Sequence, residues 1–243
     1  MTQELTKPIN LNDPKSAQVE QENPFETSKV KRKLNTKDCR ILFLYPNERG
    51  MSTIPPSITA LSQILKDEGH QTALFDTTFY KFDDEITIED SEVTKAKSLE
   101  NRPVLERDDD DIHFKKTTRS AVLDFETSIE NFKPDFIAVS CTETTFLRAI
   151  KLIEKTRHKN IINLFGGVFP TFAPDLVMNY KNVDMVCVGE GENAIIDLAN
   201  SISNNEDYSN VTNLWIRQKD GTITKNSISR PVNIDEIPPV TDI

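Results

Sequence analysis

The sequence predicts an α/β fold in which a doubly wound parallel sheet of about five strands precedes a β-hairpin. Short apolar runs alternate with segments whose apolar residues recur at helical spacing, which is the pattern of a parallel sheet covered by helices on both faces. The apolar runs end in small or polar residues, and four of the seven glycines follow two of these runs. Towards the C-terminus, the Asp220-Gly221 pair separates two strand-like segments, which is typical of a hairpin turn.

The apolar runs are predicted to form the strands. The first run, RILFLY, is apolar without alternation, which indicates a strand buried on both faces. The predicted strands are residues 40–45, 70–76, 136–140, 161–165 and 185–188.

Amphipathic helices are predicted between the strands, because apolar residues there recur every three or four positions. Gly69 follows the first of them and favours helix termination. In the helix predicted over 144–158, Phe146, Leu147 and Ile150 are expected to face inward. The predicted helices are residues 57–68, 119–131, 144–158, 174–180 and 193–203.

The chain divides into three predicted parts. Residues 1–36 are polar and predict a disordered leader. Residues 37–205 form the α/β domain, with a charged, solvated insertion over 80–118. Residues 206–243 contain the hairpin, in which Trp215 is expected to pack against the sheet, and a linker with paired prolines. The acidic run at 108–111 is read as a solvated surface, with cation binding as the less favoured interpretation.

Composition excludes several classes of partner. The net charge of −10 and the pI near 4.9 argue against a nucleic-acid surface and against binding to an anionic membrane. No apolar stretch approaches a membrane span and no signal peptide is recognisable, so a cytoplasmic location is expected. The three cysteines lack metal-ligand spacing, and Cys141 and Cys187 are expected to be small buried apolar residues.

Glycines mark the candidate site. In an open parallel sheet, ligands bind outside the carboxyl ends of the strands. Gly166, Gly167, Gly189 and Gly191 follow two of the predicted strands. Bare backbone at that edge lets a large flat or phosphate-bearing ligand approach closely. The sequence therefore predicts a binding site without catalytic side chains of its own.

Several segments together resemble a known family. They are ILFLYP, LKDEGHQTALFD, PDFIAVSCTETT, FGGVFPTFAPD, VDMVCVGEGE and RPVNIDEIPP. In this order, they are similar to the N-terminal cobalamin (B12)-binding domain of B12-dependent radical S-adenosylmethionine (SAM) enzymes, from about residue 40 to the C-terminus. The resemblance implies a Rossmann-like, flavodoxin-type sheet with the cofactor across the carboxyl ends of the strands and its nucleotide tail inside the domain.

The resemblance also implies an unusual lower face of the cofactor. The wider family carries D-x-H-x-x-G after the first strand, and its histidine binds cobalt. Here the stretch runs from Tyr45 to Gly50, with Asn47 in place of the histidine. An amide is a poor cobalt ligand, so no histidine lower ligand and no protein metal ligand are expected. Asn47 and Gly50 remain candidate cofactor contacts, although Asn47 is equally readable as a loop residue.

The remaining contacts implied by the resemblance follow the later strands. These residues also have structural interpretations that need no cofactor. The threonines can cap a helix, and the glycine pair can form a tight turn. Glu190 and Glu192 can provide a favourable charge at a helix N-terminus. The implied cofactor contacts are Ser140, Thr142, Thr144, Gly166, Gly167, Val168, Gly189, Glu190 and Gly191.

The resemblance implies a cobalamin-binding module that positions a corrinoid for a radical SAM domain in cis or trans. The CxxxCxxC motif that ligates an iron–sulfur cluster is absent from the sequence. The cluster and the S-adenosylmethionine are therefore expected only in another half, and the chain is read as a fragment, a split partner or a remnant, with a fragment favoured. Whether it forms part of an enzyme, such as a methyltransferase, depends on that half.

Two alternatives come from other classes of protein. A protein-interaction module on the same fold that has lost its cofactor fits the same sequence. An enzyme that uses a nucleotide or flavin is disfavoured, because the loop after the first strand lacks both GxGxxG and GxxxxGK[ST].

Overall fold

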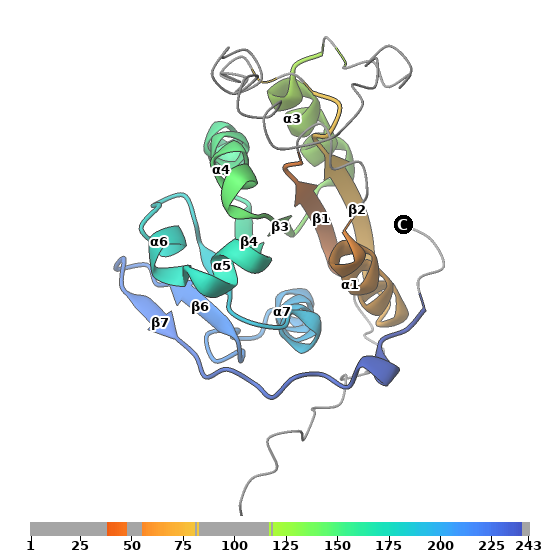
Figure 1. Ribbon diagram of the computed structural model, residues 1–243, viewed down its shortest axis with the longest axis vertical. Coiled ribbons are helices and arrows are strands. Elements are labelled where there is room, and N and C mark those ends of the chain that lie inside the picture. Colours follow the sequence, from red (N-terminus) through yellow and green to blue (C-terminus); the bar gives the residue numbers. More distant parts are fainter. Residues whose placement is uncertain (1–37, 48–54, 81, 83–116, 118, 240–243) are drawn as a thin grey trace, which may run out of the picture.

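A seven-stranded sheet forms the middle layer of the structure (Figure 1). This computed structural model describes residues 38–47, 55–80, 82, 117 and 119–239. The strand order is β2-β1-β3-β4-β5-β6-β7, in which the first five strands are parallel and the last two antiparallel. The strands are β1 Arg40–Tyr45, β2 Gln71–Asp76, β3 Phe136–Ser140, β4 Ile162–Gly166, β5 Met185–Cys187, β6 Leu214–Arg217 and β7 Ile223–Lys225. The predicted fold class is confirmed.

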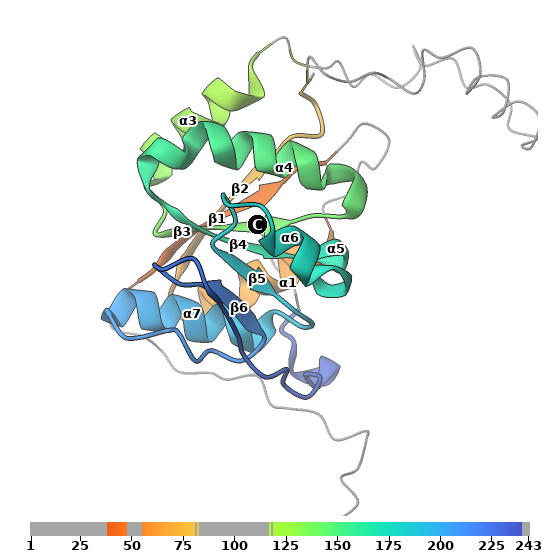
Figure 2. The same ribbon diagram turned by 90° about the vertical axis from the view of Figure 1, so that its left-hand side faces the viewer.

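Helices cover both faces of the sheet (Figure 2). Helices α1 and α7 pack on one face, while α3 and α4 pack on the other with α5 and α6 beside them. The helices are α1 Pro56–Asp67, α3 Ala121–Phe132, α4 Glu143–Thr156, α5 Val168–Phe172, α6 Pro174–Met178 and α7 Glu192–Asn204. Two 3-10 turns, η3 Arg157–Lys159 and η4 Ile234–Glu236, complete the described elements.

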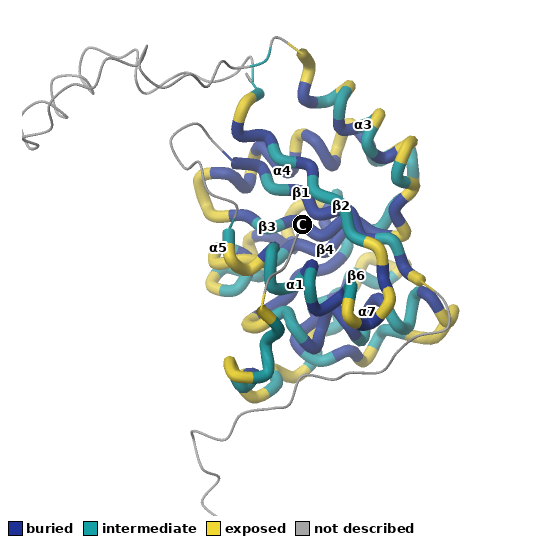
Figure 3. The backbone as a smooth tube through the Cα atoms, turned by 90° about the vertical axis from the view of Figure 1, so that its right-hand side faces the viewer, coloured by how far each residue is buried: buried dark blue, intermediate teal, exposed yellow. Residues whose placement is uncertain are grey.

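Strands β1, β3, β4 and β5 are buried on both faces, as their apolar runs predict (Figure 3), whereas the edge strands β2 and β7 are mostly half-buried. In β1, Leu42 and Leu44 face the core under α3 and α4, whereas Ile41 and Phe43 face the core under α1 and α7. The parallel sheet is thus the shared wall of two apolar cores, which explains why its strands do not alternate apolar and polar residues.

Two details differ from the sequence prediction. Helix α5 was not predicted, because its five residues contain Pro170; a proline is tolerated there since the first N–H groups of a helix have no intrahelical partner. Leu147 is 57% exposed, although it was expected to face inward. It lies about 100° around α4 from the buried Phe146, so it falls outside the apolar stripe.

The C-terminal hairpin extends the sheet instead of standing apart from it. β6 pairs antiparallel with β5, and β7 follows after a turn in which Gln218 N–H donates to the Thr222 carbonyl at 2.8 Å. Trp215 packs against the core under α4, as expected. Lys225 Nζ lies 3.9 Å from the centre of its ring.

The predicted leader and nearly all of the charged insertion lie outside the described residues. The two ends of the insertion meet, because Thr117 N–H donates to the Phe79 carbonyl at 2.8 Å. In the described part of the chain, none of the helices combines the length and the apolar character of a bilayer-spanning segment.

His70 links the start of β2 to α7. Its Nδ1 accepts the Cys39 N–H at 3.1 Å, and its Nε2 lies 3.2 Å from Asn200 Oδ1. The ring is 4% exposed, and burial lowers its pKa below the ordinary value, although the hydrogen bond with Asn200 opposes this shift. The folded protein therefore holds His70 neutral, with Nδ1 as an acceptor.

We predict that this histidine makes stability fall with acidification. The pKa of His70 is lower in the folded state than in the unfolded state, so the unfolded chain binds the proton more readily as the pH falls below about 6.5. The free energy of unfolding, measured in urea, should decrease from pH 7.5 to 5.5 more steeply for the wild type than for His70→Gln. Equal slopes in the two proteins would contradict this assignment.

Candidate functional site

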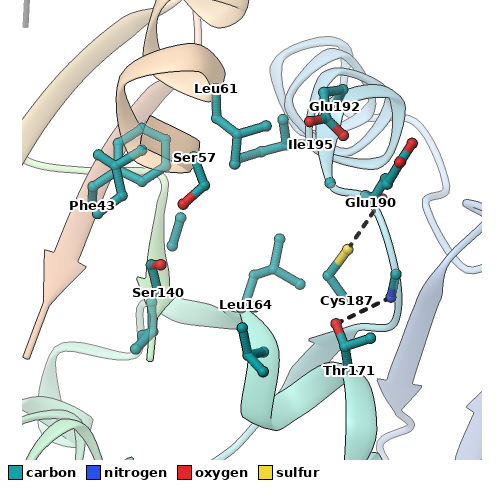
Figure 4. Close-up of a pocket in the computed structure, with 18 of the residues that line it drawn as sticks. Phe43, Ser57, Leu61, Ser140, Leu164, Thr171, Cys187, Glu190, Glu192 and Ile195 are labelled. Carbon is teal, nitrogen blue, oxygen red and sulfur yellow. Dashed lines mark hydrogen bonds between the residues drawn. The ribbon is translucent and has the colours of Figure 1, made fainter. Parts of the chain in front are cut away.

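A pocket of about 350 Å³ lies at the carboxyl ends of the parallel strands (Figure 4). Its floor includes Phe43 of β1 and Ser140 of β3, and these two strands are neighbours in the sheet. The strand order reverses at this pair, because β2 lies on one side of β1 and all later strands lie on the other. Such a switch point is where open α/β sheets bind their ligands.

The pocket is built from the ends of three helices and four strands, and its walls are mainly apolar. Helix α1 contributes one wall, the start of α7 another, and α5 lies at the rim. Its volume falls within the range of about 300–1,000 Å³ that is usual for small-molecule sites. The lining residues are Phe43, Ser57, Ile58, Leu61, Ala138, Val139, Ser140, Leu164, Gly166, Gly167, Val168, Thr171, Phe172, Cys187, Gly189, Glu190, Gly191, Glu192 and Ile195.

Most of the candidate contacts predicted from the sequence meet in this pocket. Ser140 comes from the end of β3, and the others come from the turns after β4 and β5. The candidates that line the pocket are Ser140, Gly166, Gly167, Val168, Gly189, Glu190 and Gly191. Three candidates do not line it, namely Asn47, Thr142 and Thr144. Gly50 lies outside the described residues.

The two adjacent glycines have different roles. A Cβ atom on Gly166 would lie 3.9 Å from both Cys187 Cβ and the Val139 carbonyl oxygen, which is ordinary contact. Gly167 has a φ of +105°, and a Cβ atom there would lie 2.7 Å from the Cys141 carbonyl oxygen. Gly167 is therefore required by the turn itself, whereas Gly166 leaves room that a larger side chain would fill.

We predict stability effects of different size for two alanine substitutions. Gly167→Ala should lower the free energy of unfolding by about 1–3 kcal/mol or more, because it adds a steric clash to an unfavourable φ. Gly166→Ala should change it by less than about 1 kcal/mol, since the added methyl makes no close contact. Chemical denaturation of both variants measures the difference. Similar stability losses would show that the turn tolerates a side chain at Gly167.

Asn47 is a buried structural residue of the β1 loop. It is 1% exposed, and its Nδ2 donates to Thr78 Oγ1 at 2.9 Å. Its carbonyl accepts hydrogen bonds from Thr77 Oγ1 at 2.9 Å and from the guanidinium of Arg148, which lies 4.5 Å from the centre of the Phe82 ring. The start of this loop is thus held against both α4 and the segment after β2.

Thr142 and Thr144, which follow β3, lie at the start of α4. Thr142 is the N-cap of this helix, and its N–H donates to Thr145 Oγ1 at 3.0 Å. The hydroxyls of Thr142 and Thr144 are exposed and lie 3.0 Å apart. The structure therefore fits the capping interpretation of these residues.

The loop after β5 is held from two directions. Gly189 N–H donates to Thr171 Oγ1 of α5 at 3.3 Å, and the Glu190 carbonyl accepts from Asn213 Nδ2 at 2.7 Å. The Glu190 carboxylate accepts the N–H of Val232, in the C-terminal segment. Glu190 thus already has a backbone partner.

Glu192 is a pocket residue that sequence reasoning assigned only to the helix terminus. It begins α7, and its Oε2 is a buried atom without a hydrogen-bond partner among the described residues. Burial raises the pKa of this carboxyl group and the charge of Glu190 adds to the effect, while hydrogen bonds from the backbone N–H groups of Glu192 and Gly191 oppose it. A signal was present in the sequence, because a helix that begins directly after a strand end places its first side chains at the ligand edge. Ser57, Leu61 and Phe172 were missed as well.

The pocket is suited to binding a small molecule. Burial raises the pKa of the Cys187 thiol to about 12, so this sulfur is neutral at physiological pH and ill suited to metal ligation. Cys141, below the glycine turn, has a pKa raised to about 12 for the same reason. The described residues contain no cluster of side chains able to hold a metal ion.

Comparison with known proteins finds one family match and several proteins that share the fold. The family described as the B12 binding domain matches residues 104–199. TsrM, a radical S-adenosylmethionine methyltransferase from Kitasatospora setae, superposes with a TM-score of 0.56 at 17% identity, covering 79% of this chain and 30% of TsrM. OxsB, a cobalamin-dependent S-adenosylmethionine radical enzyme, superposes with a TM-score of 0.54 at 16% identity, covering 83% of this chain and 24% of OxsB.

These comparisons confirm the resemblance expected from the sequence. The chain carries a B12-binding match and shares its fold with part of two cobalamin-dependent radical SAM enzymes. It spans less than a third of the length of either enzyme. No curated protein matches it.

Proposed function

We propose that this chain is a cobalamin-binding module that holds the nucleotide tail of the cofactor in the pocket between α1, α7 and the sheet. The observation that carries the proposal is the apolar pocket at the switch point, bordered by Gly166, in a chain with a B12-binding match. The bound cofactor would supply organometallic chemistry at cobalt, and the protein would bind it, orient it and exclude water.

The residues of the pocket fit such a tail. Ile58, Leu61 and Leu164 offer apolar walls to a flat aromatic base, and Gly166 leaves the end of β4 open. Ser140 and Glu192, which line the pocket, offer polar groups to the ribose. Val168 and Phe172 line the pocket while being 63% and 83% exposed. Their apolar surface is suited to contact with a corrin.

The proposed partner is a radical SAM domain, joined in cis or supplied in trans. The matched enzymes are more than three times longer than the region they share with this chain. In this arrangement residues 37–205 bind the corrinoid, and residues 206–243 form the hairpin and the connection. The iron–sulfur cluster and the S-adenosylmethionine belong to the partner, and the reaction of the assembly, such as a methyl transfer, is decided there.

We further propose that no histidine of this chain binds cobalt from below. Asn47, which stands at the histidine position of the wider family, is buried and donates its amide to Thr78. His70 precedes β2 and His158 follows α4, so both lie at the amino ends of the strands, opposite the pocket. His113 lies outside the described residues.

A substitution at Asn47 tests the lower-ligand proposal. Asn47→Ala should leave the visible spectrum of bound cobalamin unchanged, although losing the hydrogen bond to Thr78 should lower the free energy of unfolding by about 1–2 kcal/mol. Electron paramagnetic resonance of the reduced, Co(II) form should show no splitting from an axial nitrogen. Axial nitrogen splitting in the wild type that persists in Asn47→Ala would refute the proposal.

Cofactor uptake tests the main proposal. Titration of the wild-type chain with hydroxocobalamin should shift the visible spectrum of the cofactor. Gly166→Leu should weaken binding at least about tenfold, because its side chain would extend from the end of β4 into the pocket. Gly166→Ala is the matched control and should bind within a few-fold of the wild type.

The same titration separates the two functional classes. Absence of uptake by the wild type at tens of micromolar would refute the proposal and favour the protein-interaction module. Equal affinity of Gly166→Leu and wild type would instead place the tail elsewhere.

A further inference from the structure

The C-terminal segment 228–237, called the strap below, crosses the two helices that wall the pocket. Figure 1 shows it running from β7 past α7 to α1. Val232, which is 9% exposed, packs against Ile64 of α1 and Ile196 of α7, and Ile237 packs against the same group. The strap therefore touches both pocket helices without lining the pocket itself.

The strap is also fastened to the pocket loop, residues 188–191, which joins β5 to α7. The Glu190 carboxylate accepts the Val232 N–H. Asn213 Oδ1 accepts the Ser229 N–H at 2.6 Å, and Asn213 Nδ2 donates to the Glu190 carbonyl at 2.7 Å. These two contacts of Glu190 thus depend on where the strap lies.

The pocket loop needs such support because half of its four residues are glycines. Gly189 has a φ of +91°, and neither Gly189 nor Gly191 has a side chain that could anchor the loop. Glycine gains more conformational freedom than any other residue when a loop is released. Gly189, Glu190 and Gly191 all line the pocket, so release of the strap would loosen backbone that faces the ligand.

The strap is held to the domain by few apolar contacts. Ile228 and Ile234 are 64% and 77% exposed, so its apolar anchors are Val232 and Ile237. Segments with few buried apolar contacts open more readily than the rest of a fold. The strap can therefore dock and release while the sheet, α1 and α7 stay folded.

We propose that docking of the strap and binding of cobalamin promote each other, with Glu190 as the positioning residue that links them. This inference rests on the proposed function. A docked strap orders the pocket loop before the ligand arrives, and such preorganisation raises affinity. Because coupling between two sites is reciprocal, a bound cofactor holds the strap in place to the same extent. The strap belongs to the proposed connection to the radical SAM domain, so an occupied pocket would fix the start of that connection.

Hydrogen–deuterium exchange of the wild-type chain tests one direction of the coupling. Saturating hydroxocobalamin should slow exchange of the strap amides, including the Val232 N–H that donates to Glu190, about fivefold or more. The amides of η3 are the control, because this turn precedes β4 at the opposite edge of the sheet. Their exchange should not change.

Two serine substitutions in the strap test the other direction. Val232→Ser removes a buried anchor without altering a pocket residue, and should weaken hydroxocobalamin binding about fivefold or more in a visible titration. Val232→Ala, which keeps an apolar side chain, serves in the same way should the serine variant not fold. Ile234→Ser is the matched control, because the Ile234 side chain is exposed in the same segment, and it should bind as the wild type does.

A double variant tests the link through Glu190. Glu190→Ala should weaken binding as Val232→Ser does, because each removes one partner of the same hydrogen-bonded contact or its support. The double variant should lose no more affinity than either single variant, since both changes break one connection. A Glu190 that acts only by touching the ligand would give additive losses.

Each result decides between defined alternatives. Failure of the wild type to bind hydroxocobalamin would overturn the proposed function itself. Unchanged strap exchange on binding, or wild-type affinity in both Val232→Ser and Val232→Ala, would overturn only the coupling. Equal losses in Val232→Ser and Ile234→Ser would contradict a role for the docked strap, and additive losses in the double variant would refute the link through Glu190.

Discussion

The pocket depends on the close approach of Gly167 to the backbone of Cys141. Because Gly167 has no side chain and a φ of +105°, the chain leaves β4 and enters α5 directly against the end of β3. Cys141 N–H donates to the Gly166 carbonyl at 3.1 Å, which joins the two strand ends. This turn places α5 at the rim and leaves the surface beside Gly166 free, so a backbone constraint, rather than a polar cluster, shapes the site.

Sequence patterns predicted most of this architecture because strands β1, β3, β4 and β5 are buried on both faces. A continuous apolar run such as 40–45 is easily distinguished from amphipathic helices, and the predicted bounds of β1 and β3 match the structure. The short α5 was missed, since its position follows from the packing of Phe169 against Phe146, 5.2 Å between ring centres, and not from local periodicity. Leu147 was misplaced because its exposure depends on how α4 is rotated on the sheet.

The parts of the candidate site that the backbone forms could be predicted from the sequence. The parts that depend on where side chains point were predicted less well. The glycines at the strand ends line the pocket as expected, but Asn47, Thr142 and Thr144 turn to partners in the protein. These polar residues have local partners available, and sequence alone does not rank a local partner against a ligand. Glu192 was not among the predicted contacts. The burial of its Oε2 without a hydrogen-bond partner results from tertiary packing, which the sequence does not show.

The charges and the burial of the pocket residues are those of a binding site. The thiols of Cys141 and Cys187 are held neutral by burial, and the histidines of the described residues stand at the opposite edge of the sheet. Glu192 Oε2, a buried oxygen without a hydrogen-bond partner among the described residues, is not paired with a base or a nucleophile. In the proposed module, reactivity would come from the cofactor and from the partner domain facing it across the exposed rim formed by Val168 and Phe172.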